Sequence, residues 1–235
     1  MGPRTLLSWS SGKDSAWTLR VMRQQAEYDV VGLVTTINSA AERVAMHAVR
    51  TDLLAAQAAA AGLPLWSVPI PSPCSNAQYE AAMRAVVERA RAEAVTAFAF
   101  GDLFLADVRA YRERQLDGSG LTPVFPLWLR PTRELAREMV AGGLRAYLTC
   151  VDPKQLPARF AGRAFDGALL DELPTHVDPC GERGEFHTFA YGGPMFRRDL
   201  AVAVGEIVER DGFTFADVVP SDPTNREAPK EFARD

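Results

Sequence analysis

The sequence has few cysteines, few histidines and no long hydrophobic run, and each shortage excludes a class of protein. Its three cysteines form no C-x-x-C pair, which argues against a disulfide scaffold and a zinc ribbon. Its three histidines form no H-x-x-x-H pair, so a transition-metal site has little material. No apolar run reaches the roughly 18 residues that a membrane-spanning helix needs, and we find no signal peptide. We therefore expect a soluble, cytoplasmic protein that does not act at a membrane.

Lysine is also scarce, and the net charge is slightly negative. The formal charge of −4 argues against a broad surface for nucleic acid. Of the 26 basic residues only three are lysine, and one of them, Lys13, lies in the first polar segment of the chain. A lysine is a compact point charge that can reach a phosphate, which the planar fork of arginine does not mimic.

What the sequence does contain is an alternation of strand and helix patterns. With 235 residues and 47% hydrophobic residues, the chain can form one large α/β domain with a smaller appendage. Alternating strands and helices predict a doubly wound, parallel sheet. The predicted strands are 4–10, 29–38, 63–71 and 95–102, and the predicted helices are 14–26, 41–62, 79–94 and 107–120. A capping box of Ser75 and Gln78 precedes the third helix.

Beyond residue 120 the pattern changes, which predicts a smaller C-terminal α+β lobe. We expect a helix over 132–143 with Thr132 as its N-cap, a strand over 144–152, a long irregular region around 176–194, and a hairpin over 200–219 that turns at Asp211-Gly212. The expected division is a nucleotide-binding domain at 1–120, a substrate lobe at 121–220 and a disordered tail at 221–235.

The most informative segment is the polar loop after the first strand. Ser10, Ser11, Gly12, Lys13, Asp14 and Ser15 lie where that strand passes into a helix, at the carboxyl edge of a parallel sheet, where ligands of open α/β sheets bind. The helix N-terminus and the ammonium suit an anion. Asp14 places a carboxylate beside a site for an anion, which is explained if it orients the loop or holds a Mg²⁺ ion that accompanies phosphates. A serine-rich helix cap without a ligand is the alternative.

Two common phosphate loops do not fit this segment. The Walker A pattern would need glycine at Leu7 and serine or threonine at Asp14, and the G-x-G-x-x-G pattern fails because Gly12 is the one glycine there. The segment resembles instead the S-G-G-x-D-S pyrophosphate loop of the adenine nucleotide α-hydrolase (HUP-like) group, with Ser11 in place of the first glycine. If this position needs a positive φ, serine is costly there; an ordinary conformation would tolerate it.

A second group of polar residues follows the fourth predicted strand. Gly101 would let a nucleotide approach closely, and Asp102 could serve a metal or a nucleophile. Arg109 and Glu113 share one face of the next helix by their i,i+4 spacing. For Arg112 and Arg114 we favour a solvated, charged helix face.

The third group is the run "DPCGERGEFHTF" at 178–189. Its glycines and its polar residues Glu182, Glu185, His187 and Thr188 can bring two carboxylates and an imidazole together. Two carboxylates could act as a general base for an attacking amine, or orient an ammonium ion. A polar hairpin would use similar residues.

Together these segments, with "PLW" at 126–128, resemble the ATP-dependent diphthine–ammonia ligase family over about 6–219. The run "CGERGEFHT" is the most specific mark. The resemblance implies an ATP-dependent ligase that adenylates a carboxylate, releases pyrophosphate and forms an amide with ammonia. It implies that Gly101, Asp102 and the loop residues Ser10 to Ser15 bind ATP, that Asp14, Glu182 and Glu185 are catalytic, and that Asp14 binds Mg²⁺. The implied substrate-binding residues are Arg109, Glu113, Trp128, Gly181, His187 and Thr188.

Two other functions remain open from the sequence. One is a tRNA-modifying enzyme of the same loop group, for which Cys180 beside the third segment would matter. The other is a module that senses ATP or AMP without turnover. The expected partners are ATP, ammonium, and an acceptor that is either a protein side chain or a small carboxylate, and a homodimer is left open.

Overall fold

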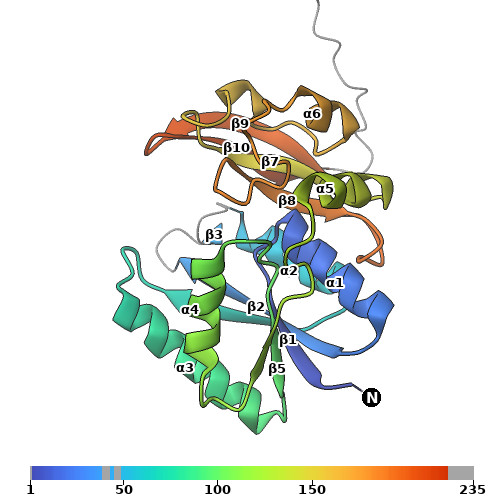
Figure 1. The fold of residues 1–235 in the computed structure, drawn as a ribbon. Helices are drawn as coiled ribbons and strands as arrows, with labels where there is room; N and C mark the ends of the chain where they lie inside the picture. The colour runs from blue at the N-terminus through green and yellow to red at the C-terminus, as the bar shows by residue number, and fades with distance from the viewer. Residues whose placement is uncertain (1, 39–42, 45–48, 222–235) are drawn as a thin grey trace, which may run out of the picture.

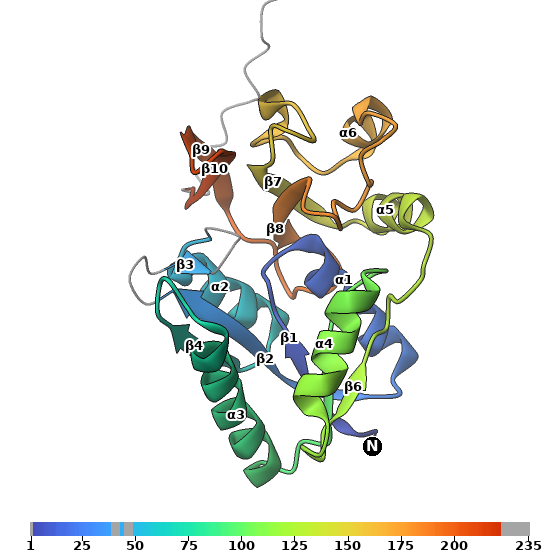
Figure 2. The same cartoon turned by 60° about the vertical axis from the view of Figure 1, so that its left-hand side comes forward.

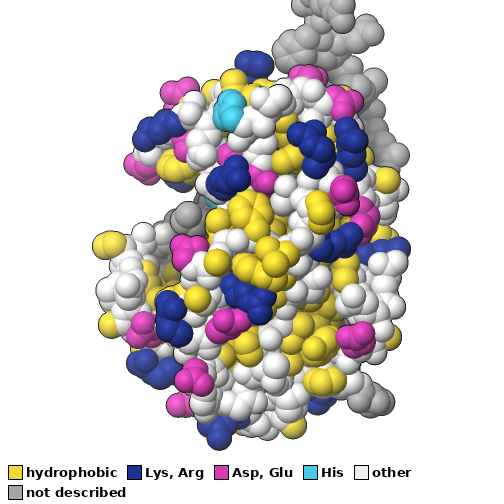
Figure 3. All heavy atoms as spheres, in the orientation of Figure 1, with side chains coloured by type: hydrophobic (Ala, Val, Ile, Leu, Met, Phe, Trp, Pro, Cys, Tyr) yellow, Lys and Arg dark blue, Asp and Glu magenta, His cyan; other side chains and the backbone are white. Residues whose placement is uncertain are grey.

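The computed structural model describes residues 2–38, 43–44 and 49–221 in two lobes, each built on its own sheet (Figure 1). Of the predicted tail at 221–235, residues 222–235 lie outside the described residues. In the part of the chain that is described, no helix is long and apolar enough to cross a membrane. On the face drawn in Figure 3, basic and acidic side chains are interspersed without a broad patch of either sign.

The first sheet is the predicted parallel sheet. Its parallel strands are β1 (Arg4–Ser8), β2 (Asp29–Asn38), β4 (Leu65–Ile70), β5 (Ala97–Ala99) and β6 (Thr122–Val124). Pairing runs β4–β2–β1–β5–β6, so the chain winds outward from β1 in both directions. The doubly wound architecture is confirmed, and the order reverses between β1 and β5, which is where open α/β sheets bind ligands.

Helices cover both faces of this sheet, and the strands alternate their side chains between two cores. Leu7 of β1 packs into the core that includes α1 (Lys13–Gln25) and α2 (Thr51–Ala61). Its neighbour Leu6 packs into the core that includes α3 (Asn76–Ala92), with α4 (Ala106–Leu116) beside it (Figure 2). Because successive residues of a strand point to opposite faces, this double burial fits a central parallel strand.

The second lobe contains an antiparallel sheet in the order β8–β7–β10–β9. Its strands are β7 (Arg145–Val151), β8 (Phe186–Gly192), β9 (Val202–Arg210) and β10 (Phe213–Pro220), with α5 (Thr132–Ala141), a 3₁₀ turn (Ala158–Phe160) and α6 (Gly167–Glu172). The predicted hairpin is confirmed, because Asp211 and Gly212 both have positive φ between β9 and β10. The smaller C-terminal α+β lobe is therefore present.

Several local details differ from the sequence predictions, among them the following. The helix predicted over 41–62 begins at Thr51, and Arg43–Val44 forms β3, antiparallel to the end of β2. The N-cap of α5 is Pro131, not Thr132. The Thr132 hydroxyl donates instead to Asp178 Oδ2 at 2.7 Å. The region predicted to be irregular contains β8, a strand that the sequence analysis missed.

Other predictions of local structure are confirmed or remain open. The capping box of Ser75 and Gln78 is present at the start of α3. The division of the chain into units at 1–120 and 121–220 stays a prediction; β6, at 122–124, pairs with β5 in the first sheet.

Candidate active site

The loop from Trp9 to Gly12 lies between β1 and α1, next to the point where the strand order of the first sheet reverses. Gly12 is the N-cap of α1, in an extended conformation, and makes no side-chain cap. Ser10 Oγ accepts a hydrogen bond from Gly12 N at 3.3 Å and lies 3.2 Å from Ser15 Oγ. One hydroxyl from the loop and one from the first turn of α1 thus lie at the positive end of this helix, which suits an anion.

Ser11 adopts the costly conformation that the sequence left open. Its φ is 69°, in the left-handed region, and its side chain is fully buried. Its Oγ has no hydrogen-bond partner among the described residues. A left-handed non-glycine residue costs about 1–2 kcal/mol, so other contacts must impose this backbone.

Gln57 supplies one of those contacts, and the sequence analysis did not identify it. Its side chain is completely buried in the alanine-rich α2. Its Nε2 donates to the carbonyl oxygens of Ser11 at 2.9 Å and Ala190 at 2.5 Å, and its Oε1 accepts from Trp9 Nε1 at 3.0 Å. Ala190 N also donates to Ser11 O at 2.9 Å. The sequence feature that could have indicated this role is a single glutamine within an alanine-rich helix.

Lys13 and Asp14 form a buried ion pair at the start of α1. Lys13 Nζ lies 2.9 Å from Asp14 Oδ2 and also donates to the carbonyl oxygen of Cys180. Burial opposes the charge on Lys13, but the carboxylates around it outweigh burial and raise its pKa. Burial raises the pKa of Asp14 despite the neighbouring ammonium. Asp14 Oδ1 has no hydrogen-bond partner among the described residues, so it can meet a further cation or donor.

These groups open into a cavity of about 250 Å³ between the two lobes. Ten of the predicted site residues line it, and they come from the loop, the end of β5 and the segment before β8. They are Ser10, Lys13, Asp14, Ser15, Gly101, Asp102, Gly181, Glu182, His187 and Thr188. Ser8, Phe100, Leu105, Arg112 and Phe186 also line the cavity and were not predicted, and so does Cys180, which the sequence had singled out only for a tRNA-modifying function.

Gly101 lines the cavity, and the structure gives a further reason for a glycine at this position. A Cβ there would lie 3.1 Å from Thr18 Oγ1 and 3.2 Å from the backbone of Asp14 and Ser15. Glycine therefore allows the end of β5 to approach the first turn of α1. This contact brings Asp102 to the cavity beside the loop.

The segment at 178–188 is a compact turn, and Glu185 lies in its interior. Glu185 is 2% exposed; its Oε1 accepts from Asp178 N and its Oε2 from Arg183 N, both at 2.9 Å. It does not line the cavity. The catalytic role of Glu185 stays a prediction; in this structure both of its oxygens accept backbone hydrogen bonds, so the carboxylate shapes the turn.

Glu182 is the carboxylate of this segment that faces the cavity. Its Oε1 accepts from Leu103 N at 2.8 Å, which ties the second lobe to the segment after β5. Burial, reinforced by Asp14 and Asp102, raises the pKa of Glu182 to about 7. Burial also raises the pKa of Asp102. A carboxyl group that titrates near neutrality can accept or release a proton at physiological pH.

His187 and Thr188 connect β8 to the loop. Thr188 Oγ1 accepts from Lys13 N at 3.0 Å. Burial and the nearby Lys13 charge lower the pKa of His187 to about 4, so the imidazole is neutral at pH 7. Burial raises the pKa of the Cys180 thiol well above its usual range, which leaves this cysteine a poor nucleophile.

The remaining predicted substrate residues lie outside the cavity. Arg109 Nε binds Glu113 Oε1 at 2.8 Å, and the Arg109 guanidinium lies 4.8 Å from the Trp128 ring centroid. None of these three residues lines the cavity.

Arg112 is not on a solvated face, contrary to the sequence interpretation. Its side chain is 27% exposed, its Nε lies 3.6 Å from Asp102 Oδ2, and its guanidinium lies 5.1 Å from the ring centroid of Phe100. Arg112 therefore forms part of the cavity wall. Arg114, which received the same interpretation, is exposed as expected.

Comparison with known proteins agrees with this organisation. Residues 3–123 match the model of the diphthamide synthase N-terminal domain, and residues 131–218 match that of the diphthamide synthase C-terminal domain.

Several curated relatives are diphthine–ammonia ligases. The Homo sapiens protein is 31% identical over 105 residues, which cover 42% of this chain and 39% of that protein. The Mus musculus protein is 32% identical over 103 residues, with the same shares covered, and the Schizosaccharomyces pombe protein is 30% identical over 95 residues, which cover 38% of this chain and 16% of that protein. The chain thus covers less than two thirds of the length of these relatives. The two matched domains confirm the resemblance, and the chain belongs to the diphthamide synthase family.

Proposed function

We propose that this protein is an ATP-dependent ligase that adenylates a carboxylate and converts it to an amide with ammonia. The observation that carries the proposal is the cavity in which the β1–α1 loop, Lys13 and Asp14 meet Asp102 and Glu182. The relatives named diphthine–ammonia ligase support the same reaction class. The acceptor would be a protein side chain or a small carboxylate.

In this proposal, the loop binds the phosphates of ATP. The N-terminus of α1, the hydroxyls of Ser10 and Ser15 and the ammonium of Lys13 would hold and orient the polyphosphate. An oxygen of the acceptor carboxylate attacks the α-phosphorus, the bond to the β-phosphate breaks, and pyrophosphate leaves. The product of this first step is an acyl-adenylate.

Three carboxyl groups beside a polyphosphate favour a Mg²⁺ requirement. Asp14 Oδ1 and Asp102 Oδ2 are buried, and neither accepts a hydrogen bond among the described residues. These oxygens fit Mg²⁺, which proteins commonly hold through one or two carboxylates together with substrate phosphates. The described residues contain no group of three side chains that could hold a metal alone, so phosphate oxygens would complete the site. The ion would neutralise charge on the phosphates.

Glu182 is our candidate for the proton acceptor in the second step. Ammonium must lose a proton before its nitrogen can attack the acyl carbon and displace AMP. A carboxylate with a pKa of about 7 is a suitable base near neutral pH. Thr188 and Glu185 act as positioning residues, because the first fixes Lys13 and the second shapes the turn that carries Glu182.

The test is to identify the phosphate products. Wild-type protein, Asp14→Asn and the control Asp107→Asn are incubated with α-labelled ATP, Mg²⁺, ammonium and a desalted cell extract. Asp107 is an exposed acid in the first turn of α4, outside the cavity, so its variant matches the chemical change alone. We expect AMP and pyrophosphate from wild type and control, with at least about a tenfold loss in Asp14→Asn.

Two outcomes would contradict the proposal. ADP and phosphate as products would rule out adenylation. Tight ATP binding, measured separately by calorimetry, without turnover at any acceptor concentration would favour the sensor function instead. A tRNA-thiolating role gains no support from Cys180, because its thiol is buried and its pKa is raised.

A further inference from the structure

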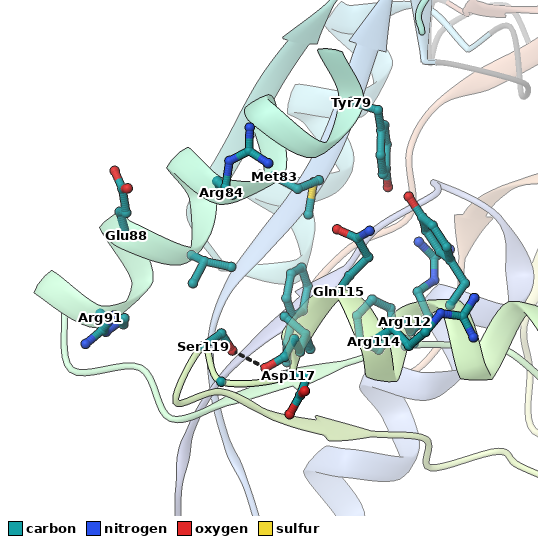
Figure 4. Close-up of a pocket in the computed structure, with 16 residues that line it drawn as sticks. Tyr79, Met83, Arg84, Glu88, Arg91, Arg112, Arg114, Gln115, Asp117 and Ser119 are labelled. Carbon is teal, nitrogen blue, oxygen red and sulfur yellow. Dashed lines mark hydrogen bonds between the residues drawn. The ribbon is translucent and has the colours of Figure 1, made fainter. Parts of the chain in front are cut away.

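A second and larger cavity lies between α3 and α4, on the face of the parallel sheet that these helices cover (Figure 4). Its volume is about 380 Å³. Tyr79, Met83, Val87 and Arg91 follow one another at four-residue spacing, so they line one side from a single face of α3. Met83 of α3 and Gln115 of α4 both point into the space between the two helices (Figure 4). We call this cavity the α3–α4 groove.

The floor of the α3–α4 groove is aromatic. Phe98 and Phe100 lie beneath the two helices with their rings stacked at a centroid distance of 4.8 Å. Met83 and Val87 add half-buried apolar walls. Phe98 and Phe100 are themselves only 1% and 4% exposed, so the apolar surface that a ligand could cover lies mainly on Met83 and Val87.

The rim of the groove carries an excess of positive charge. Arg84, Arg91 and Arg114 line it, and none of them forms an ion pair with any described residue. The acids on the same rim are Glu88 and Asp117. Three guanidinium groups without an ion-pair partner among the described residues thus stand beside two carboxylates, and the charge of Arg112 is compensated by Asp102, so the rim has an excess of one positive charge and favours an anion.

Arg112 belongs to both cavities. It lines the α3–α4 groove as well as the candidate active site. Its Nε is buried and lies 3.6 Å from Asp102 Oδ2, too far for a hydrogen bond, and no described residue accepts from it. The Asp102 carboxylate faces this nitrogen as an ion pair, so Arg112 links the two cavities and its charge is already compensated.

We propose that the α3–α4 groove is a second ligand site, which binds a small carboxylate carrying a flat apolar group. The apolar part contacts the walls formed by Met83 and Val87, and the carboxylate meets the arginines of the rim. This site does not require that the protein be a ligase, because none of its features depends on ATP. Arg112 gives it a direct physical connection to Asp102 in the neighbouring cavity.

The experiment uses 2-naphthoate as the probe and neutral 2-naphthamide as its isosteric control, with binding followed by ligand-observed NMR on the full chain. The test variant is Arg84→Gln/Arg91→Gln, which removes two exposed charges of the rim. The matched control is Arg133→Gln/Arg198→Gln, which removes two exposed charges that do not line the groove. Because all four residues are exposed and outside the candidate active site, folding and ATP binding should persist.

We expect 2-naphthoate to bind wild type and control alike, about fivefold or more weaker binding to the test variant, and weaker binding of 2-naphthamide to wild type. Three results would overturn the proposal: no binding of 2-naphthoate at millimolar concentration, equal binding by test and control variants, or equal binding of the neutral amide. A failure of ATP turnover would leave these results unaffected, so the two proposals can fail separately.

Discussion

Replacing Ser11 by glycine is expected to stabilise the protein. Ser11 has a φ of 69°, and glycine adopts this region without the Cβ clash that serine suffers. The serine hydroxyl is also buried without a hydrogen-bond partner among the described residues. The backbone contacts of this residue, with Gln57 and Ala190, do not involve its side chain and should survive the change.

The size of the effect follows from three contributions. Release of the left-handed strain is worth about 1–2 kcal/mol. Removal of a buried hydroxyl without a partner adds about 1 kcal/mol, at the lower end of the range for such groups. The greater freedom of glycine in the unfolded chain costs about 0.4–1 kcal/mol. The net gain in free energy of unfolding is about 1–2.5 kcal/mol, which raises Tm by at least about 2–5 °C for a chain of this size.

The assay is thermal and urea unfolding of wild type, Ser11→Gly and Ser11→Ala. Alanine removes the hydroxyl but keeps the Cβ, so the difference between the two variants isolates the backbone strain. We expect Ser11→Gly to exceed Ser11→Ala by about 1 kcal/mol. If Ser11→Gly unfolds more easily than Ser11→Ala, the reasoning from φ is refuted. Affinity for ATP should not change, because the Ser11 side chain does not line the cavity.

Three further predictions concern the same region. Gln57→Leu loses three buried hydrogen bonds and should lower the free energy of unfolding by about 2–4 kcal/mol in urea, whereas the exposed Gln24→Leu should change it little. Gly181→Ala should destabilise more than Gly118→Ala in thermal unfolding: both have similar positive φ, but a Cβ at Gly181 would lie 2.7 Å from the Phe186 carbonyl oxygen and one at Gly118 meets nothing within 4 Å. The folded protein raises the pKa of Glu182 to about 7, so as the pH rises the unfolded state loses this proton first. The stability that protonated Glu182 contributes is complete below about pH 4.5 and is lost as the pH rises to 7. The free energy of unfolding of Glu182→Gln should therefore rise by about 1–3 kcal/mol relative to wild type between pH 5 and 8, and a pH-independent difference would contradict this.

The parallel sheet and its loop could be predicted because their signals are local. Runs of apolar and β-branched residues alternate with helix patterns, and the polar loop follows the first strand directly. Parallel strands end at one edge, so the loop and Gly101-Asp102 were expected on that edge, and both line the same cavity. The strand β8 was missed because glycines and polar residues around it resemble a loop, while its pairing with β7 is set by the second sheet.

The roles of Glu185 and Arg112 could not be predicted from sequence spacing. Glu182 and Glu185 are three residues apart and chemically equivalent, but one faces the cavity and the other bonds the backbone of its own turn. Arg112 and Arg114 are likewise similar in sequence, and only the packing of α4 on Phe100 separates them. Burial of a charge depends on which elements meet, which the pattern of one helix does not contain.

The second lobe is part of the construction of the loop, because it supplies contacts that the first sheet does not. Ala190 N donates to the Ser11 carbonyl oxygen, Thr188 accepts from Lys13 N, and the Cys180 carbonyl oxygen accepts from Lys13 Nζ. A strained residue such as Ser11 persists only where its surroundings over-determine it. It follows that the parallel sheet alone would not hold the loop in this conformation, and that the two matched domains of the chain have to fold together to form the cavity.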